Sequence, residues 1–187
     1  MKKIALSALL LSISAVADAS VLNFDSIGVQ NSVYPYYTQT GFIEQGFQFS
    51  NNSDVVDLVD SSWNYGAHSG EFAALNDYYG DMVVTLAGGG VFSFQNTYVK
   101  GWANSGGFSA SITGYFGNQV VGQVDYTMGG DWQLITGNFN NIDRLVFSGG
   151  TFLVDDVTLN AVPVPAAAWL FGSGLMGLVG IARRQLA

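Results

Sequence analysis

One stretch decides the fold of this chain: residues 108–127 read FSASITGYFGNQVVGQVDYT. Apolar side chains alternate with serine and threonine through 108–113, and apolar or small residues recur at every second position through 120–126. A period of two predicts strands with one buried face. Gly117-Asn118, between the two halves, is a turn signal. The stretch therefore predicts two strands joined by a tight turn.

The same pattern extends outward along the chain. Alternation recurs at 46–50, 91–94, 145–147 and 152–154, and glycine- or asparagine-rich turn signals separate these segments at 51–53, 88–90, 105–107, 129–130 and 149–150. No segment of the middle region repeats apolar residues with the period of a helix over a useful length. We therefore predict an all-β fold, an antiparallel β-sandwich of the jelly-roll type with some ten short strands.

Composition excludes several classes of protein and of site. Charged residues make up 11% of the chain and aromatics 14%, which is not the composition of a disordered chain. The absence of cysteine excludes disulfides, thiolate metal sites and cysteine nucleophiles. The middle region has thirteen acidic residues, from Asp25 to Asp156, and only two basic ones, Lys100 and Arg144. This negative net charge argues against a nucleic-acid partner. The same acidity is compatible with cations or neutral glycans.

The N-terminal segment 1–19 predicts a signal peptide. Lys2 and Lys3 precede an apolar run over 4–16, and Ala17 and Ala19 form a small-x-small cleavage site for signal peptidase. The mature chain would then begin at Ser20, with a β-sandwich ectodomain over 20–161. The alternative, an uncleaved membrane anchor, is disfavoured by the short apolar run.

The C-terminal segment 162–187 has three parts. Val162-Pro163-Val164-Pro165 comes first, an apolar run over 166–182 follows, and Arg183-Arg184 lies in the tail 183–187. As a helix, the apolar run would be about 26 Å long, enough to cross a bilayer. Positive charge stays on the cytoplasmic side, so this predicts a transmembrane helix with the ectodomain outside.

This three-part layout resembles a PEP-CTERM sorting signal of the VPLPA type. The stretch that matches best within the apolar run is Trp169-Leu170-Phe171-Gly172-Ser173-Gly174-Leu175. The resemblance implies a membrane processing enzyme, exosortase, as partner. It also implies transient anchoring in the inner membrane and delivery to the cell surface or the extracellular matrix, in bacteria that make exopolysaccharide and biofilm. Val164 stands where the main family has glutamate, which leaves the exosortase subtype open. The alternative is a plain tail anchor without processing.

The segments 21–25 and 152–159 are predicted as the first and last strands of the sandwich, and this framing resembles galactose-binding-like jelly rolls, which are common among carbohydrate-binding modules. The resemblance implies that these strands pair and that acidic residues near each hold a structural calcium. Asp25, Asp155 and Asp156 are the candidate ligands, because calcium takes carboxylate oxygens. Adjacent strand residues point to opposite faces, so at most one of Asp155 and Asp156 would face inward. The alternative is that both are solvated.

A second acidic group, Asp54, Asp57 and Asp60, lacks the spacing of a calcium-binding loop and predicts a strand with acidic edges. Trp63 and Tyr65 are the candidate glycan-binding residues, because hydroxyl, amide and imidazole groups at Ser61, Ser62, Asn64 and His68 surround them in the sequence. Aromatic rings stack on sugars, and polar neighbours bind hydroxyls. The alternative is ordinary burial in the core.

No catalytic constellation is evident. His68 is the only histidine, so neither a histidine-based triad nor a multi-histidine metal site can be assembled; it is predicted to make a local hydrogen bond in a loop. We therefore predict a non-enzymatic, exported surface or matrix protein that associates with exopolysaccharide. Two alternatives stay open: a secreted polysaccharide hydrolase using Glu44 or Glu71 with an aspartate, and a passive structural protein without a specific ligand.

Overall fold

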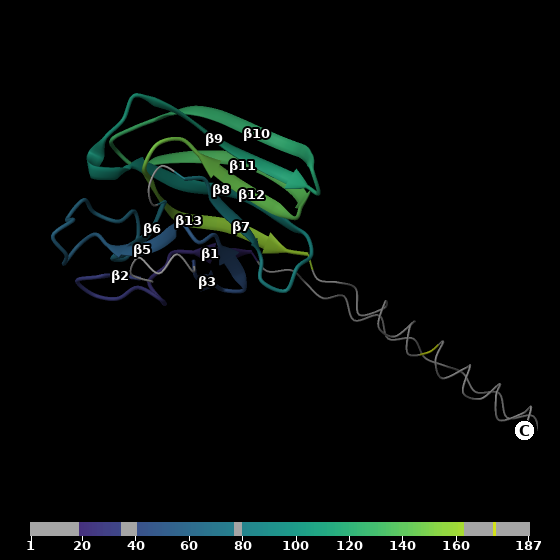
Figure 1. Ribbon diagram of the computed structural model, residues 1–187, viewed down its shortest axis with the longest axis horizontal. Helices are drawn as coiled ribbons and strands as arrows, with labels where there is room; N and C mark the ends of the chain where they lie inside the picture. The colour runs from purple at the N-terminus through teal and green to yellow at the C-terminus, as the bar shows by residue number, and fades with distance from the viewer. Residues whose placement is uncertain (1–18, 35–40, 77–79, 163–173, 175–187) are drawn as a thin grey trace, which may run out of the picture. The chain divides into compact units, whose positions relative to one another are not determined.

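The computed structural model describes residues 19–34, 41–76, 80–162 and 174 (Figure 1). Over the described residues between 19 and 162, the regular structure is β apart from one turn of 3-10 helix, η2 (Trp102–Asn104). The strands are β1 (Ser20–Leu22), β2 (Val33–Tyr34), β3 (Ile43–Glu44), β4 (Phe47–Phe49), β5 (Ser53–Asp57), β6 (Phe72–Asn76), β7 (Met82–Leu86), β8 (Phe92–Gly101), β9 (Phe108–Phe116), β10 (Gln119–Met128), β11 (Gln133–Ile142), β12 (Arg144–Ser148) and β13 (Phe152–Ala161).

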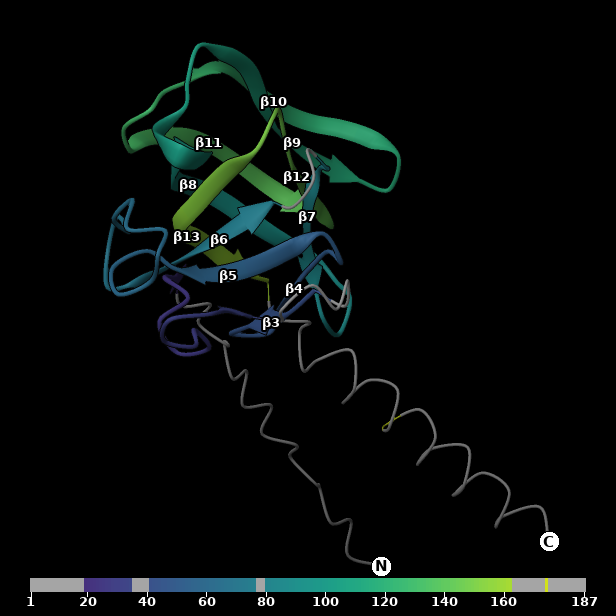
Figure 2. The same cartoon turned by 60° about the vertical axis from the view of Figure 1, so that its left-hand side comes forward.

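These strands form two antiparallel sheets that make a sandwich. Sheet A has the order β11-β8-β13-β6-β5-β2, and β1 also pairs with β13. Sheet B has the order β10-β9-β12-β7-β4-β3. Figure 2 shows β8, β13, β6 and β5 of sheet A side by side. The predicted all-β sandwich is confirmed.

The stretch 108–127 forms the antiparallel pair β9 and β10, with partners running from Gln119 opposite Phe116 to Met128 opposite Phe108. The predicted strand length was wrong, because β8, β9, β10, β11 and β13 each have nine or ten residues. Five strands, β2, β3, β6, β7 and β11, were not predicted. β6 is buried on both faces and shows no alternation, and β11 carries two irregularities of register that interrupt its pattern.

The first and last strands pair as predicted, with Ser20 opposite Leu159 and Leu22 opposite Val157. The first strand is shorter than the predicted 21–25, because it ends at Leu22. Phe24 has a φ of 64°, which is uncommon for a bulky residue and marks a tight bend. That bend places the Phe24 ring in the core, edge-on to Phe42 and Phe49 at 5.9 and 5.5 Å between ring centroids.

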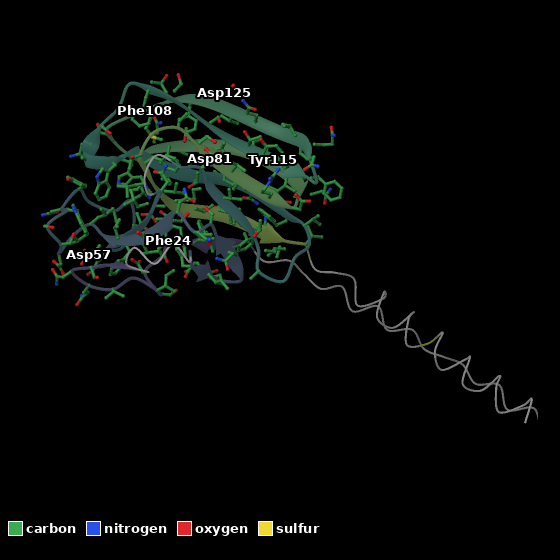
Figure 3. All side chains as sticks on the ribbon, in the orientation of Figure 1. Phe24, Asp57, Asp81, Phe108, Tyr115 and Asp125 are labelled. Atoms are coloured by element: carbon green, nitrogen blue, oxygen red, sulfur yellow. The ribbon has the colours of Figure 1, made fainter. Side chains whose placement is uncertain are left out.

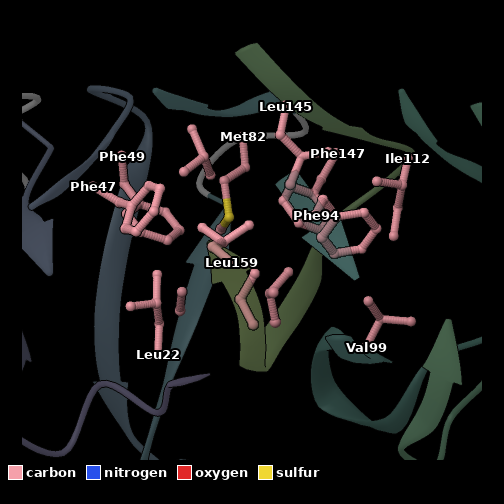
Figure 4. Packing of buried hydrophobic residues seen from close by; sticks show 14 of the residues in the cluster. Leu22, Phe47, Phe49, Met82, Phe94, Val99, Ile112, Leu145, Phe147 and Leu159 are labelled. Atoms are coloured by element: carbon pink, nitrogen blue, oxygen red, sulfur yellow. The ribbon is translucent and has the colours of Figure 1, made fainter. Parts of the chain in front are cut away.

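A continuous apolar core lies between the two sheets, rich in phenylalanine (Figure 4). Phe94 of sheet A contacts Phe147 of sheet B edge-on, at 6.3 Å between centroids, and Phe139 at 5.6 Å. The two sheets approach closely where the Phe139 ring of sheet A packs against Gly114 and Gly122 of sheet B. A Cβ atom at these glycines would lie 2.8 and 2.4 Å from the Phe139 ring, so larger residues would not fit without movement. Because the chain has no disulfide, this packing holds the domain together.

The two predicted terminal segments fall mostly outside the described residues. Of the signal peptide only Ala19 is described, and of the sorting segment only Val162 and Gly174, so Ala17, Pro163, Val164, Pro165, Arg183 and Arg184 lie outside. Among the described residues, no helix has the length and hydropathy needed to cross a membrane. The predicted transmembrane helix therefore stays a prediction.

Truncation of Phe94 tests the core. We expect Phe94→Ala to lower the free energy of unfolding by about 3–5 kcal/mol, because a fully buried ring is replaced by a cavity. Phe116→Ala is the control, since this ring is 56% exposed, and it should cost less than about 1 kcal/mol. Urea denaturation of both variants measures the difference. Equal losses would contradict the position of the core.

Candidate functional site

A second apolar cluster lies on the outer face of sheet A. Its members are Val56 and Leu58 with Ala73, Leu75 and Leu153, and all are buried. Their strand neighbours Val55, Ala74 and Val154 belong to the core between the sheets. Sheet A is therefore buried on both faces here, which explains why every residue of β5 and β6 is buried, the polar ones included.

The segment 58–71 between β5 and β6, the covering loop, lies over this outer face together with two tryptophans from other parts of the chain. Figure 2 shows the loop at the left, next to β5 and β6. Trp63, Tyr65, Trp102 and Trp132 pack on the apolar cluster; we call these four residues the aromatic layer. The Trp102 ring contacts Tyr65 edge-on at 5.1 Å and Trp63 at 6.1 Å between centroids.

The two predicted glycan-binding residues, Trp63 and Tyr65, thus both belong to the aromatic layer. Trp63 and Tyr65 are half-buried, with one side on apolar side chains, while Ser62 and Asn64 beside them are exposed. Trp132 was missed by the sequence analysis. Its only local signal is its position after the turn Gly129-Gly130, and 67 residues separate it from Tyr65 in the chain. Only pairing of the strands brings these rings together.

Lys100 fixes the aromatic layer from below. Its ammonium group is buried and donates to the Tyr65 carbonyl at 2.6 Å, and it lies 5.9 Å from the centre of the Trp132 ring. That distance is within the range of a cation–π contact. The Trp132 Nε1–H donates to the Gly66 carbonyl at 3.0 Å. Loop, lysine and tryptophan therefore form one connected unit.

Asp57 holds the start of the covering loop. Its carboxylate accepts the backbone N–H groups of Val59 and Asp60 at 2.9 and 3.0 Å and that of Asn31 at 2.7 Å. Burial opposes the charge, but these N–H donors outweigh it and hold the pKa of Asp57 below its usual value. The predicted acidic edges of this strand were wrong at Asp54 and Asp57, because both side chains are buried.

Asp155 holds the other end of the loop. Its Oδ2 accepts the backbone N–H groups of His68 and Ser69 at 2.9 and 3.0 Å, and its Oδ1 accepts that of Asp156 at 2.7 Å. The carboxylate is fully buried. Burial raises the pKa of Asp155 to about 7; the nearby Asp156 charge acts in the same direction, and the N–H donors act against both.

Asp156 also faces the loop, although the sequence predicted opposite faces for the two aspartates. The register of β13 shifts between Asp155 and Thr158, and Asp156 has a φ of 47°. This bulge breaks the alternation, so the Asp156 carboxylate lies 2.7 Å from the His68 Nδ1 and accepts the Ser69 hydroxyl at 2.7 Å. The His68 ring stacks on Tyr98 at 3.4 Å between centroids. Its predicted local hydrogen bond was wrong, because its partners are 87 and 88 residues away.

Asp25 contacts the same loop. Its Oδ1 accepts the backbone N–H of Glu71 at 3.0 Å, and its carboxylate lies against Gly70, where a Cβ would come within 1.9 Å of it. All three calcium candidates therefore meet one loop, but as acceptors for backbone and side-chain donors. The described residues contain no group of three or more histidine, cysteine, aspartate or glutamate side chains that could hold a metal ion. A bound calcium would have to displace these donors, so calcium stays a prediction, which calorimetric titration can test.

The outer face of sheet B differs in character. A shallow groove of about 530 Å³ lies over β9, β10 and β12, and the polar side chains that line it are Ser109, Ser111, Asp125, Thr127 and Ser148. A glycosidase needs two carboxyl groups across its cleft, and Asp125 is the single carboxylate lining this groove. Glu44 is buried, with the Ser26 hydroxyl donating to both of its carboxylate oxygens.

The chain is only distantly similar to proteins of known structure. No protein family profile and no curated protein matches the chain. Solved structures, among them carbohydrate-binding modules, match the chain at low identity and with TM-scores below 0.5. A family 61 carbohydrate-binding module in complex with β-1,4-galactotriose has 16% identity and a TM-score of 0.37 over 63% of this chain and 90% of that one. The CBM22-1 xylan-binding domain from Paenibacillus barcinonensis has 13% identity and a TM-score of 0.45 over 81% and 99%. The K2 cleaved adhesin domain of Lys-gingipain has 10% identity and a TM-score of 0.47 over 78% and 98%.

The raised pKa of Asp155 makes stability depend on pH. The folded chain holds this proton up to about pH 7, whereas an unfolded carboxyl releases it near 3.8. The resulting stabilisation is complete below pH 3.8 and is lost as the pH rises through 7. We expect the free energy of unfolding of the wild type, relative to Asp155→Asn, to fall by roughly 2–4 kcal/mol between these limits.

Urea denaturation at several pH values, in the presence of a chelator, measures this difference. Asp131→Asn, which removes one exposed carboxylate, is the control. A difference between wild type and Asp155→Asn that stays constant from pH 4 to pH 8 would contradict the assignment.

Proposed function

We propose that this chain is an exported, non-catalytic protein of the cell surface or extracellular matrix that binds exopolysaccharide through the aromatic layer. The observation that carries the proposal is the arrangement of Trp63, Tyr65, Trp102 and Trp132, four large half-exposed rings that rest on a buried apolar base. Hydroxyl and amide groups of the exposed residues Ser62 and Asn64 lie next to them in the covering loop.

Rigidity is the physical reason for this choice. A flexible surface loses conformational entropy when it binds a ligand, whereas a preorganised one does not. The carboxylates of Asp57 and Asp155 fix the two ends of the covering loop, and Lys100 fixes Tyr65. Rings held in this way offer apolar area for stacking on sugar rings at low entropic cost. A chain of sugars would also donate hydroxyls to the surrounding carbonyl and amide oxygens.

The charge distribution favours a ligand without negative charge. In the described part of the chain, the only basic side chains besides His68 are Lys100 and Arg144. Lys100 is buried under the aromatic layer, and Arg144 stacks on Tyr115 at 4.3 Å. Exposed carboxylates would repel a polyanion, and these two cations are already engaged. A neutral polysaccharide therefore fits this surface better than an acidic one.

The proposal includes the route to the outside. Segment 1–19 would be removed by signal peptidase, and segment 162–187 would be a PEP-CTERM-like sorting signal handled by exosortase. The residues that support this are Val162-Pro163-Val164-Pro165, the apolar run over 166–182 and Arg183-Arg184. After transient anchoring in the inner membrane, the sandwich would reside at the cell surface or in the matrix.

Binding is tested by affinity electrophoresis of the protein through gels that contain the host's exopolysaccharide. We expect retardation of the wild type and a loss of affinity of about tenfold or more in Trp63→Ala and Trp102→Ala, because each removes a stacking surface. Phe116→Ala, an exposed aromatic on another part of the molecule, is the matched control and should run like the wild type. Unretarded wild-type protein would leave a passive structural role.

Processing is tested by the intact mass of the protein isolated from its host. We expect a mature N-terminus at Ser20 and a C-terminus near the segment 162–165, without Arg183 and Arg184. A protein that retains both arginines would contradict processing and support a plain tail anchor.

A further inference from the structure

The groove on the outer face of sheet B is built from strand residues in register. Asp125 on β10 lies opposite Ser111 on β9, and Ser111 lies opposite Ser148 on β12. Thr127 lies opposite Ser109 in the next row. Neighbouring strands are about 4.8 Å apart, so the three-strand row extends over about 10 Å. These side chains point outward, because the alternate residues, such as Ala110, pack on the core.

The polar groups of the groove are available to a ligand. Within the described chain, the hydroxyls of Ser109, Ser111, Thr127 and Ser148 have no protein hydrogen-bond partner. The Asp125 carboxylate is oriented by one bond only, from the Gln123 amide nitrogen to Oδ1 at 2.7 Å. Its second oxygen and four hydroxyls thus present donors and acceptors on a rigid sheet, without the entropy cost of ordering a loop.

No basic side chain lines the groove. None of its lining residues is lysine or arginine, and Arg144 lies at the far end of β12, stacked on Tyr115. The Asp125 carboxylate would repel the sulfate, phosphate or uronate groups of a ligand bound in the groove. A ligand rich in hydroxyl groups and without negative charge matches this lining, because hydroxyls can donate to Asp125 and exchange bonds with serine and threonine.

We propose that this groove is a second polysaccharide-binding site, specific for neutral sugar chains, and that the domain therefore bridges two chains of the matrix. The bridging rests on the proposed function of the aromatic layer. The aromatic layer covers the outer face of sheet A and the groove lies on the outer face of sheet B, so the two sites face in opposite directions. Figure 3 shows Asp125, from the groove, and Asp57, from the start of the covering loop, on opposite sides of the domain.

Two sites that face apart cannot bind the same short segment of polysaccharide, but they can join separate chains. Each site alone would bind weakly. Once one site is occupied, the second site experiences a high effective concentration of polysaccharide, so a protein with two sites is retained longer in the matrix. This adds a mechanical role to binding, since a bivalent domain links chains that a monovalent one only decorates.

A bridging assay tests the proposal with the full chain in detergent. Beads carry the neutral fraction of the host's exopolysaccharide, and the same fraction, labelled with a fluorophore, is added in solution after the protein. We expect the wild type to retain the label on the beads. The double variant Asp125→Ala/Ser111→Ala and the double variant Trp63→Ala/Trp102→Ala should each still bind the beads through the remaining site, but retain at least about fivefold less label.

Two controls make the assay specific. Thr85→Ala removes a hydroxyl from sheet B outside the groove and should bridge like the wild type. A mixture of the two double variants should not restore bridging; restoration would show that chains associate, and would overturn bridging by a single chain. Better retention of the acidic than of the neutral fraction would overturn the assigned ligand class.

The remaining outcomes separate this inference from the proposed function. Undiminished bridging by Asp125→Ala/Ser111→Ala would overturn the second site and leave the aromatic layer in place. If Trp63→Ala/Trp102→Ala binds and bridges like the wild type, the aromatic layer fails as a site, and bridging by these two faces fails with it. If the wild type does not bind the beads at all, both are overturned.

Discussion

The arrangement of the candidate site depends on one buried carboxylate. Asp155 lies on the outer face of sheet A and accepts three backbone N–H groups, two of them from the covering loop. The loop has no regular secondary structure over most of its length, so its N–H groups need partners from elsewhere when they are buried. Placing a carboxylate there is costly, as its raised pKa shows, but the bonds that it accepts fix where the loop lies. Asp57 does the same for the start of the loop, and Asp25 adds one further bond, from Glu71, beside the end that Asp155 holds.

This constraint makes the two outer faces of the sandwich unlike each other. Over sheet A, the fixed loop allows Trp63 and Tyr65 to meet Trp102 and Trp132 on an apolar base, so this part of the face is covered. On sheet B, the groove over β9, β10 and β12 is lined instead by serine and threonine hydroxyls and the Asp125 carboxylate. The phenylalanine-rich core between the sheets is a continuous cluster, separate from the side chains on the two outer faces. The core and the two candidate surfaces are therefore built from different residues, although Asp155 couples the covering loop to stability.

That separation would suit the exported protein that we propose, because the chain has no cysteine to form disulfides. The burial of Phe94, Phe139 and Phe147 against close-set glycines supplies stability where a cross-link would otherwise be needed. The acidic surface, with Lys100 and Arg144 both engaged, discourages association with polyanions. The aromatic layer lies on one outer face and the hydroxyl-lined groove on the other, and both kinds of surface suit uncharged sugars.

The sequence by itself determined the fold class, because a period of two in 108–127 can bury one face only in a strand. Its resemblance to galactose-binding-like jelly rolls implied that the first and last strands pair, and the polar neighbours of Trp63 and Tyr65 made these two the candidate glycan-binding residues. Only the tertiary structure decided the rest. Trp132 joins the site across 67 residues of sequence, and no local pattern encodes a contact made through strand pairing. The sequence placed Asp155 and Asp156 on opposite faces, but a bulge turns both toward one loop, because a positive φ interrupts the alternation on which that inference rests. The groove on sheet B consists of ordinary outward-facing strand residues, and it became a candidate site only when three strands placed them in one row.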